Sequence, residues 1–453
     1  MTQDEDGGER SGRQERPGPR ATAMPAFAPH PARDLVLGEI HARPFHPVTS
    51  TRTFLRYGFQ VDDAGAEADR QWFAGHCRAS GAAGPEPASR HHMVRIGDTV
   101  LQRERHGEFV TYTWDGPLDP TAPRDAPPPD HPFGAGFRAA GPLLVAARLD
   151  FVDADTPAFA ERLAAFDGTS LSASDVDRGA ATIATDFRQD RDGLTRLLVG
   201  ARDLTDVQAG ALVQRLLELE TYRTFAMLGL AEANRQSPSV SSIEATLLSL
   251  TERMRQSEGL EANRALLTDL TRLAGDLEAG AARSAYRFGA SRAYYQIVRQ
   301  RLETIGETSR QGHFTFTQFL SRRLAPAMRT CETLEERQAN LSRKLARAAT
   351  LLRTRVDVEL QEQARGQLEA MNRRARLQLR LQQTVEGLSV AAVSYYVVGL
   401  IAYLAKGAKA GPLKGLLPGP ETLTALAVPV VLVVVFLTVR RIRRHHGEAD
   451  GEG

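Results

Sequence analysis

The pattern of apolar and polar positions changes character twice along the chain. Up to about residue 200, short runs rich in aromatic and β-branched residues alternate with turn residues. These runs are 51–60 (TRTFLRYGFQ), 93–100, 108–114 (EFVTYTW), 143–152, 181–187 and 194–199. They predict roughly five to seven strands, with helices near 64–79 and 156–165. The first part of the chain is therefore expected to be an α+β domain whose strands pair mainly antiparallel.

From residue 205 onward, apolar positions recur every three or four residues, which predicts helices. One helix is expected over 206–234, with Pro238 breaking it, and another opens at Ser241. A third covers 260–304, and a short one ends near Pro326. The second part of the chain is therefore expected to be entirely helical.

The segment 329–383 contains no proline and a single glycine, Gly366. Its apolar seam recurs at seven- and four-residue steps, at Leu334, Leu341, Leu345, Leu352 and Val356. This spacing predicts one long helix that continues into the next apolar segment, either as a coiled-coil stalk or as part of a packed bundle. In both interpretations the seam needs a partner, within the chain or in another copy.

Two apolar segments without charged side chains follow, at about 388–405 and 422–439. Each approaches the roughly 20 residues that a helix needs to cross a bilayer. Arginines precede the first segment at 373, 374, 376 and 380. They follow the second at Arg440, Arg441, Arg443 and Arg444. Because arginine-rich flanks stay on the cytoplasmic side, the pattern predicts an inner-membrane protein with two spans and both termini in the cytoplasm.

This pattern divides the chain into five predicted regions. They are a disordered tail (1–30), a cytoplasmic α+β domain (31–203), a helical stalk domain (204–383), a transmembrane hairpin (384–442), and a basic then acidic tail (443–453). The first region is polar and rich in glycine and proline, so it cannot bury enough surface to offset the entropy of ordering.

Composition adds two constraints. The formal net charge of the 453-residue chain is +2, so no nucleic-acid partner is expected. Cys77 and Cys331 are the only cysteines, and a disulfide framework is not expected, as befits a reducing cytoplasm. The partners expected are the lipid bilayer and further copies of the chain, joined through the stalk helices.

Two groups of histidine and carboxylate side chains are candidate divalent-metal ligands, since imidazole and carboxylate both bind zinc and similar ions. The candidates are Glu39, His41, His46, Glu104, His106 and Glu108. The alternative is structural: histidines bonded to backbone in the first group, and arginine–glutamate pairs across strands in the second. A third group comprises Asp186, Arg188, Asp190, Arg191, Asp192 and Arg196. Its carboxylates could hold a hard cation, but the interleaved arginines favour internal neutralisation. Glu220 and Arg223 are spaced to pair on a helix.

Within the predicted spans, aromatic residues indicate anchoring at the membrane surface. Tyr395, Tyr396 and Tyr403 are expected at the interface between lipid and water, together with the arginines that follow the second span.

Five stretches carry a resemblance to a known family. They are EIHARPF (39–45), RERHGEF (103–109), TDFRQDRDGLTR (185–196), QRLLELETYR (214–223) and the long segment 320–400. They resemble a bacterial family of uncharacterised membrane-anchored proteins, domain of unknown function 3422. The resemblance implies a membrane-anchored cytoplasmic body and supplies no catalytic residues.

The layout is also similar to that of CorA-type magnesium channels, which join a cytoplasmic α/β domain to the membrane through a long stalk helix. Their Gly-Met-Asn filter should close the first span, but residues 402–407 read Ala-Tyr-Leu-Ala-Lys-Gly. Lys406 would place a positive charge near a cation entrance.

Three functions are consistent with the sequence. The leading hypothesis is a non-enzymatic, oligomeric scaffold or sensor anchored in the inner membrane. The first alternative is a CorA-like divalent-cation channel or transporter. The second is a cytoplasmic enzyme that depends on a metal held by the histidine and glutamate groups.

Overall fold

The computed structural model of the chain describes residues 30, 31, 33, 45–49, 51–87, 89–119, 121, 125–310, 312–409 and 419–449. The chain divides into two compact units. The first unit comprises the described residues up to Ala245 together with Gly275–Arg343. The second comprises Thr246–Ala274 and the described residues from Lys344 onward.

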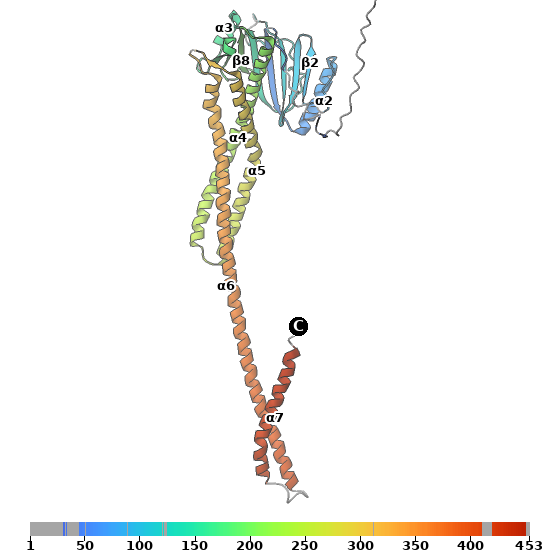
Figure 1. Ribbon diagram of the computed structural model, residues 1–453, viewed down its shortest axis with the longest axis vertical. Coiled ribbons are helices and arrows are strands. Elements are labelled where there is room, and N and C mark those ends of the chain that lie inside the picture. Colours follow the sequence, from blue (N-terminus) through green and yellow to red (C-terminus); the bar gives the residue numbers. More distant parts are fainter. Residues whose placement is uncertain are drawn as a thin grey trace, which may run out of the picture. The chain divides into compact units, whose positions relative to one another are not determined.

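A nine-stranded mixed sheet forms the N-terminal part of the first unit (Figure 1). The strands are β1 (Arg52–Gln60), β2 (His91–Ile96), β3 (Thr99–Arg105), β4 (Phe109–Pro117), β5 (Leu143–Asp153), β6 (Ser172–Val176), β7 (Ala181–Thr185), β8 (Thr195–Ala201) and β9 (Thr308–Ser309). Their order is β2-β3-β4-β1-β5-β8-β7-β6-β9. Strands β5 and β8 pair in parallel, and every other described ladder is antiparallel. The predicted α+β class with mainly antiparallel pairing is confirmed.

One predicted strand is wrong in its extent. Residues 93–100 were expected to form a single strand, but the chain turns at Gly97 and Asp98 between β2 and β3. Gly97 has a φ of +60°, a conformation that glycine adopts at little cost. The apolar pattern therefore spans a hairpin rather than one strand.

The two faces of the sheet carry different side chains. On one face, α2 (Asp63–Ala79) packs its apolar side on a cluster of large buried residues. This cluster comprises Leu55, Phe59, Ala66, Phe73, Cys77, Val94, Leu101, Val110, Tyr112 and Trp114. A second cluster packs around α3 (Pro157–Ala164) and includes Phe159, Phe166, Val152 and Leu198. The alternation of side chains along the strands turns the other face toward the long helices.

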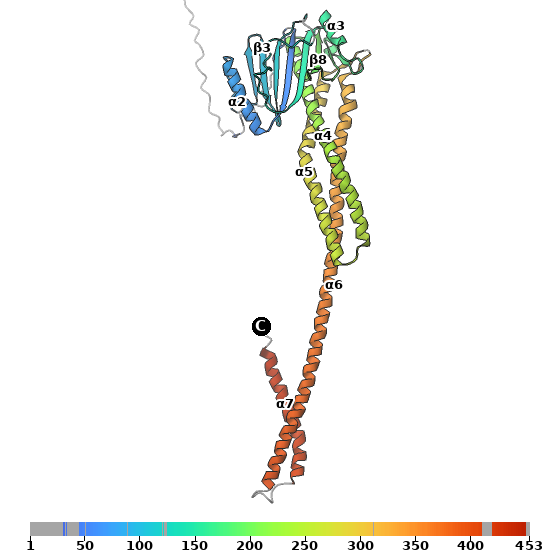
Figure 2. The ribbon, with the colours of Figure 1, turned by 180° about the vertical axis from the view of Figure 1, so that it is seen from behind.

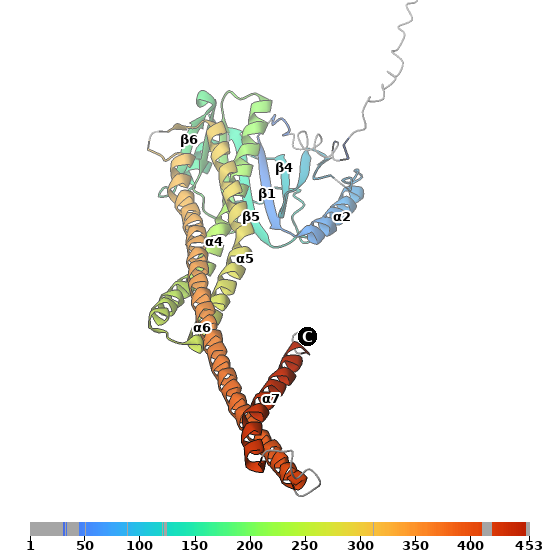
Figure 3. The same ribbon diagram turned by 60° about the horizontal axis from the view of Figure 1, so that its bottom comes forward.

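Two long helices continue from the sheet, α4 (Asp206–Gln256) and α5 (Leu260–Ile305), and a third, α6, covers Phe316–Lys409. Within the first unit, the parts of α4, α5 and α6 that belong to it lie side by side (Figures 2 and 3). Gly229 on α4, Ser291 on α5 and Cys331 on α6 mark a close approach. A Cβ at Gly229 would lie 2.7 Å from Ser291 Oγ and 3.1 Å from Cys331 Sγ.

The helices pass through two prolines that were expected to end them. Pro238 lies inside α4 and Pro326 inside α6. Proline costs a helix one hydrogen bond and adds a clash with the preceding turn. Buried residues on both sides of each proline, such as Val240 after Pro238 and Leu324 before Pro326, hold the helices against their neighbours. Tertiary packing therefore outweighs the local propensity.

The seam of α6 finds its partner within the chain. Leu334, Leu341, Leu345, Leu352 and Val356 are all buried. In the first unit, Arg337 forms an ion pair with Glu244 at 2.7 Å, and Ser342 donates to Glu278 at 2.6 Å. In the second unit, Asn263 donates to Glu359 at 2.9 Å. Of the two predicted interpretations, the structure shows the packed bundle over this stretch.

Within the second unit, α6 continues beyond the bundle, as predicted, into the first apolar segment. The next helix, α7 (Pro420–Ala449), contains the second apolar segment. In Figure 3, α7 lies across the C-terminal part of α6. Both helices are long and apolar enough to cross a membrane, and only 6% and 11% of their most apolar windows are buried.

Candidate functional site

Glu104, the first of the predicted metal ligands, is bound by an arginine. It lies on β3, and Arg56 Nη2 on β1 donates to Glu104 Oε2 at 3.1 Å. Arg56 also donates to Thr113 and to Thr221 on α4, both at 2.9 Å. The Arg56 and Glu104 side chains are only 4% and 6% exposed. The buried Arg56 side chain therefore joins Glu104 of the sheet to Thr221 of α4.

Glu108 lies just before β4 and faces α5. Arg287 Nη1 donates to Glu108 Oε1 at 2.8 Å, and a second hydrogen bond joins Arg287 Nη2 to Glu108 Oε2. Tyr294 Oη also donates to Glu108 Oε1, at 2.9 Å. Burial, followed by the bond to this carboxylate, raises the pKa of Tyr294 far above its usual range. The hydroxyl thus stays protonated and keeps donating.

The two histidines of the candidate set lie in different places. The His106 ring stacks on Phe109 with centroids 4.1 Å apart, and its Nε2 lies 3.3 Å from Thr111 Oγ1. His46 Nε2 lies 3.4 Å from Asp115 Oδ1. The backbone at His46 approaches α4 so closely that a Cβ at Gly210 would be 2.2 Å from the His46 carbonyl oxygen.

Glu39 and His41 lie outside the described residues. Among the residues that the structure describes, no group of three or more His, Cys, Asp or Glu is placed to hold a metal ion. Glu104 and Glu108 point to different arginines rather than to a shared centre. A divalent-metal site at the six predicted residues therefore stays a prediction.

The acidic turn before β8 is tied to its own arginines. Asp190 forms an ion pair with Arg196 and accepts the backbone N–H of Leu194 at 2.9 Å. Burial by itself would raise the pKa of Asp190. The Leu194 N–H and the Arg196 guanidinium outweigh this effect and hold the pKa of Asp190 below its usual range. Glu220 and Arg223 form the predicted helical pair, joined by two hydrogen bonds, of which the one from Arg223 Nη2 to Glu220 Oε1 measures 2.6 Å.

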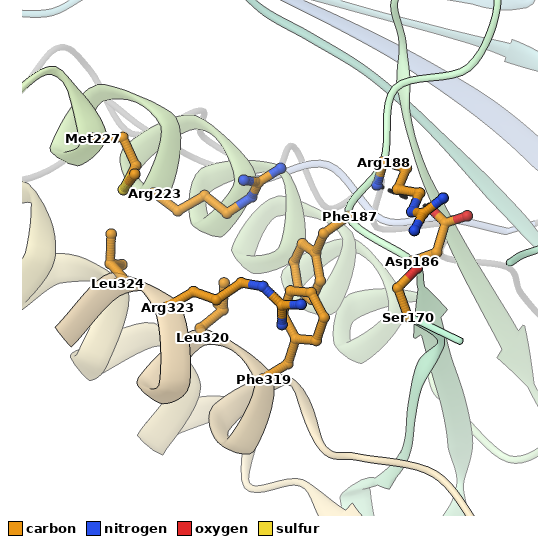
Figure 4. Close-up of a pocket in the computed structure, with 10 residues that line it drawn as sticks. All are labelled: Ser170, Asp186, Phe187, Arg188, Arg223, Met227, Phe319, Leu320, Arg323 and Leu324. Atoms are coloured by element: carbon orange, nitrogen blue, oxygen red, sulfur yellow. Dashed lines mark hydrogen bonds between the residues drawn. The ribbon is translucent and has the colours of Figure 1, made fainter. Parts of the chain in front are cut away.

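A cavity of about 280 Å³ lies within the first unit, where the β7–β8 connection meets α4 and α6 (Figure 4). Two phenyl rings stand at its centre. Phe187, from the connection, stacks on Phe319 of α6 with ring centroids 4.6 Å apart and an interplanar angle of 19°. The full lining is Ser170, Asp186, Phe187, Arg188, Arg223, Met227, Phe319, Leu320, Arg323 and Leu324.

Arginines cover this ring pair. The guanidinium carbon of Arg323 lies 4.0 Å from the centroid of Phe319, and that of Arg223 lies 5.0 Å from the centroid of Phe187. Stacking on a ring face holds a guanidinium in place while its N–H edge stays free to donate. Arg188 forms an ion pair with Asp167 at 2.5 Å.

The backbone at the cavity is unusual. Phe187 has a φ of +55°, a conformation that bulky side chains rarely adopt and that costs of order 1–3 kcal/mol. Asp186 holds this segment by accepting the N–H of Arg188 at 3.0 Å and that of Asp167 at 3.1 Å. Such outliers are concentrated at functional sites.

The sequence contained signals for parts of this cavity but not for the whole. Asp186 and Arg188 belong to the charged group around Asp190, and Arg223 was predicted to pair with Glu220, while Phe187, Phe319 and Arg323 were not assigned to any site. The FTQFLSRR stretch at 316–323, with aromatic residues beside two arginines, is the signal that would have pointed to this arginine-lined cavity.

The predicted membrane-anchoring residues lie on α6 and α7. Tyr395, Tyr396 and Tyr403 are 78%, 72% and 78% exposed. Arg440 and Arg441 are exposed on α7, and Arg443 and Arg444 belong to the same helix. Ser394 and Val431 are buried, at 4% and 7% exposure.

Comparison with known proteins identifies one family. The family described as "Protein of unknown function (DUF3422)" matches residues 28–446, which include the sheet, the three long helices and the two apolar segments. No curated protein and no solved structure matches this chain. Because the match covers most of its length, the chain belongs to the DUF3422 family.

Proposed function

We propose that this protein is a membrane-anchored scaffold or sensor whose folded body is carried on a self-associating stalk. One observation carries the proposal. Residues 360–385 of α6, here called the stalk segment, are exposed along their whole length and lead directly into the first apolar segment. A solitary helix of this kind is marginal in water, since most helices depend on packing of an apolar face.

The stalk segment carries exposed apolar residues on one side of the helix. Leu360, Leu368, Met371 and Leu379 follow one another at steps of eight, three and eight residues, which places them on one side of the helix. Their exposed fractions are 39%, 61%, 64% and 56%. A second copy of the same segment presents a matching stripe, so the simplest partner is another copy in a coiled coil.

Exposure of the apolar segments supports the membrane anchor. Residues such as Leu400, Leu404 and Phe436 are more than half exposed, whereas the core helix of a soluble protein buries such side chains. We place both ends of the hairpin on the cytoplasmic side of a bacterial inner membrane, because arginines flank both spans.

Cysteine crosslinking in native membranes tests the self-association. In Leu368→Cys, oxidation is expected to give a covalent dimer, because the side chain lies on the apolar stripe. The matched control is Arg373→Cys, which projects from the opposite side of the same helix. The two native thiols are buried, so the parent protein gives the background. Only monomer from Leu368→Cys, or equal dimer from both variants, would refute the stalk proposal.

One observation favours a second candidate, a cation channel of CorA-like layout. α6 is a single helix from Phe316 to Lys409, so it passes from the folded body into the first apolar segment without a break. Magnesium flux into liposomes that contain the purified protein would support this candidate, and the absence of flux above that of empty liposomes would remove it.

A further inference from the structure

We propose that the cavity around Phe187 and Phe319 binds a small, soluble organic phosphate, with its phosphate on the arginines and an apolar or aromatic body against the cavity wall. This inference goes beyond the scaffold and does not depend on its oligomeric state. All the lining residues belong to one unit.

The cavity lining contains three arginines (Arg188, Arg223 and Arg323) and one carboxylate, Asp186, so its charge favours an anion. Arg188 and Arg223 are paired with Asp167 and Glu220. Arg323 and its neighbour Arg322 form no ion pair with any residue that the structure describes, and both contact aromatic rings, at 4.0 Å and 5.2 Å from the centroids. Two cations without an acidic partner suit a doubly charged group, and a phosphate monoester carries nearly two charges at neutral pH.

The cavity extends toward Arg322. An adjoining cavity of about 370 Å³ is lined by Thr169, Ser170, Phe314, Phe319, Arg322 and Arg323. Three of these residues also line the first cavity. Arginine N–H groups bind phosphate oxygens through paired, charge-assisted hydrogen bonds. Arg323 lines both cavities, and Arg322 lines the adjoining one.

Ser170 supplies a second, independent indication of a ligand. The residue is only 9% exposed, and its hydroxyl oxygen is buried. Its hydroxyl finds no hydrogen-bond partner in the described part of the chain. Buried polar groups are nearly always paired, and Ser170 lines both cavities. A phosphate oxygen in the cavity would accept the hydrogen bond that this hydroxyl lacks.

The remaining wall is apolar. Met227 on α4 and Leu320 and Leu324 on α6 line the side of the cavity away from Ser170 (Figure 4). Small-molecule sites combine such a surface with a few converging polar groups. An inorganic ion alone would leave this wall uncovered, so the ligand should join its charge to an apolar body.

The test uses the full-length protein in phosphatidylcholine nanodiscs and three probes, measured by titration calorimetry. Phenyl phosphate is expected to bind saturably, inorganic phosphate more weakly, and benzyl alcohol without saturation. Arg323→Gln should weaken phenyl phosphate binding roughly tenfold or more, because a charge-assisted hydrogen bond is lost. Arg329 is an exposed arginine on the same helix that forms no ion pair with a described residue, and Arg329→Gln should change the affinity less than about twofold.

A second variant separates binding from folding. Ser170→Ala should weaken phenyl phosphate binding about threefold or more, while the unfolding midpoint without ligand is not lowered, since the hydroxyl has no partner to lose. Three results would overturn the proposal: no saturable binding of phenyl phosphate, equal binding to Arg323→Gln and the parent, or an unchanged affinity in Ser170→Ala.

One further arm distinguishes a soluble ligand from a lipid headgroup, which offers the same phosphate chemistry. Repeating the titration in phosphatidylglycerol nanodiscs should leave the affinity for phenyl phosphate unchanged. A large fall in affinity there would assign the cavity to the anionic lipid and refute the soluble ligand.

Discussion

Glu108 and Arg287 lie 179 positions apart in the sequence and meet in a two-oxygen ion pair between the sheet and α5. The side chains are 9% and 15% exposed, and Tyr294 donates to the same carboxylate. Glu108, a candidate metal ligand in the sequence, instead joins the sheet to α5 within the first unit.

Removing the arginine should leave a buried carboxylate without its charge partner. We expect Arg287→Ala to lower the free energy of unfolding by about 2–4 kcal/mol, slightly less than for a fully buried pair. The measurement is a chemical unfolding curve of the purified protein. Arg299→Ala is the control on the same helix, because its pair with Glu303 is 63% and 73% exposed. A loss as small as that of the control would contradict this role.

Glu307 binds the first turn of α6 and should control its fraying. Its carboxylate accepts the N–H of Phe316 at 2.8 Å and that of Thr317 at 2.5 Å, together with the Ser174 hydroxyl at 2.6 Å. Glu307→Gln removes the charge from the positive end of the helix and should cost about 1 kcal/mol.

Hydrogen exchange measures this change locally. Amides at the start of α6 should exchange faster in Glu307→Gln, whereas Glu303→Gln, whose side chain is 73% exposed, should leave them unchanged. Equal exchange rates in Glu307→Gln and the parent would show that the cap contributes nothing.

Pro238 lies exposed inside α4 and should destabilise the helix it occupies. We expect Pro238→Ala to raise the free energy of unfolding by about 1–2 kcal/mol. The gain from the restored hydrogen bond and the relieved clash exceeds the entropy that the flexible unfolded chain regains. Ser239→Ala should stay within about 0.5 kcal/mol of the parent. A lower stability of Pro238→Ala would indicate that the proline is required where it is.

The two thiols should be unreactive in the folded protein. Burial, followed by the charge of Glu335, raises the pKa of Cys331 to about 11, and burial also raises the pKa of Cys77. At pH 8, three units below the Cys331 pKa, the thiolate fraction is about one in a thousand, and only the thiolate reacts. Ellman's reagent should therefore label both cysteines only after unfolding. Rapid labelling of the native protein would refute this.

The sequence predicted the elements with a regular pattern and missed those that depend on distant contacts. The periodicity of Leu334 to Val356 was enough to predict α6, and the aromatic runs were enough for β1, β4 and β5. Pro238 and Pro326 were taken as helix ends because a single sequence shows local propensity but not the packing that opposes it. The turn at Gly97 was missed because its apolar neighbours continue the strand pattern across it.

The cavity could not be predicted from the sequence for the same reason. Phe187 and Phe319 are far apart in the sequence, and only the completed fold stacks their rings. Arg223 was predicted to pair locally with Glu220, and it does so, whereas Arg323 was assigned to no site. The charge pattern of the sequence therefore predicted ion pairs between neighbouring residues. It did not predict the cavity, because the residues that line it come from distant segments of the chain.

The membrane anchor is the claim on which the stalk and the topology both depend, and an alkaline carbonate wash of native membranes tests it most directly. The full-length protein should stay in the membrane pellet, and a variant with Leu404→Arg and Val434→Arg, two exposed positions in the apolar helices, should be released in larger part. Recovery of the unmodified protein in the soluble fraction would contradict the account.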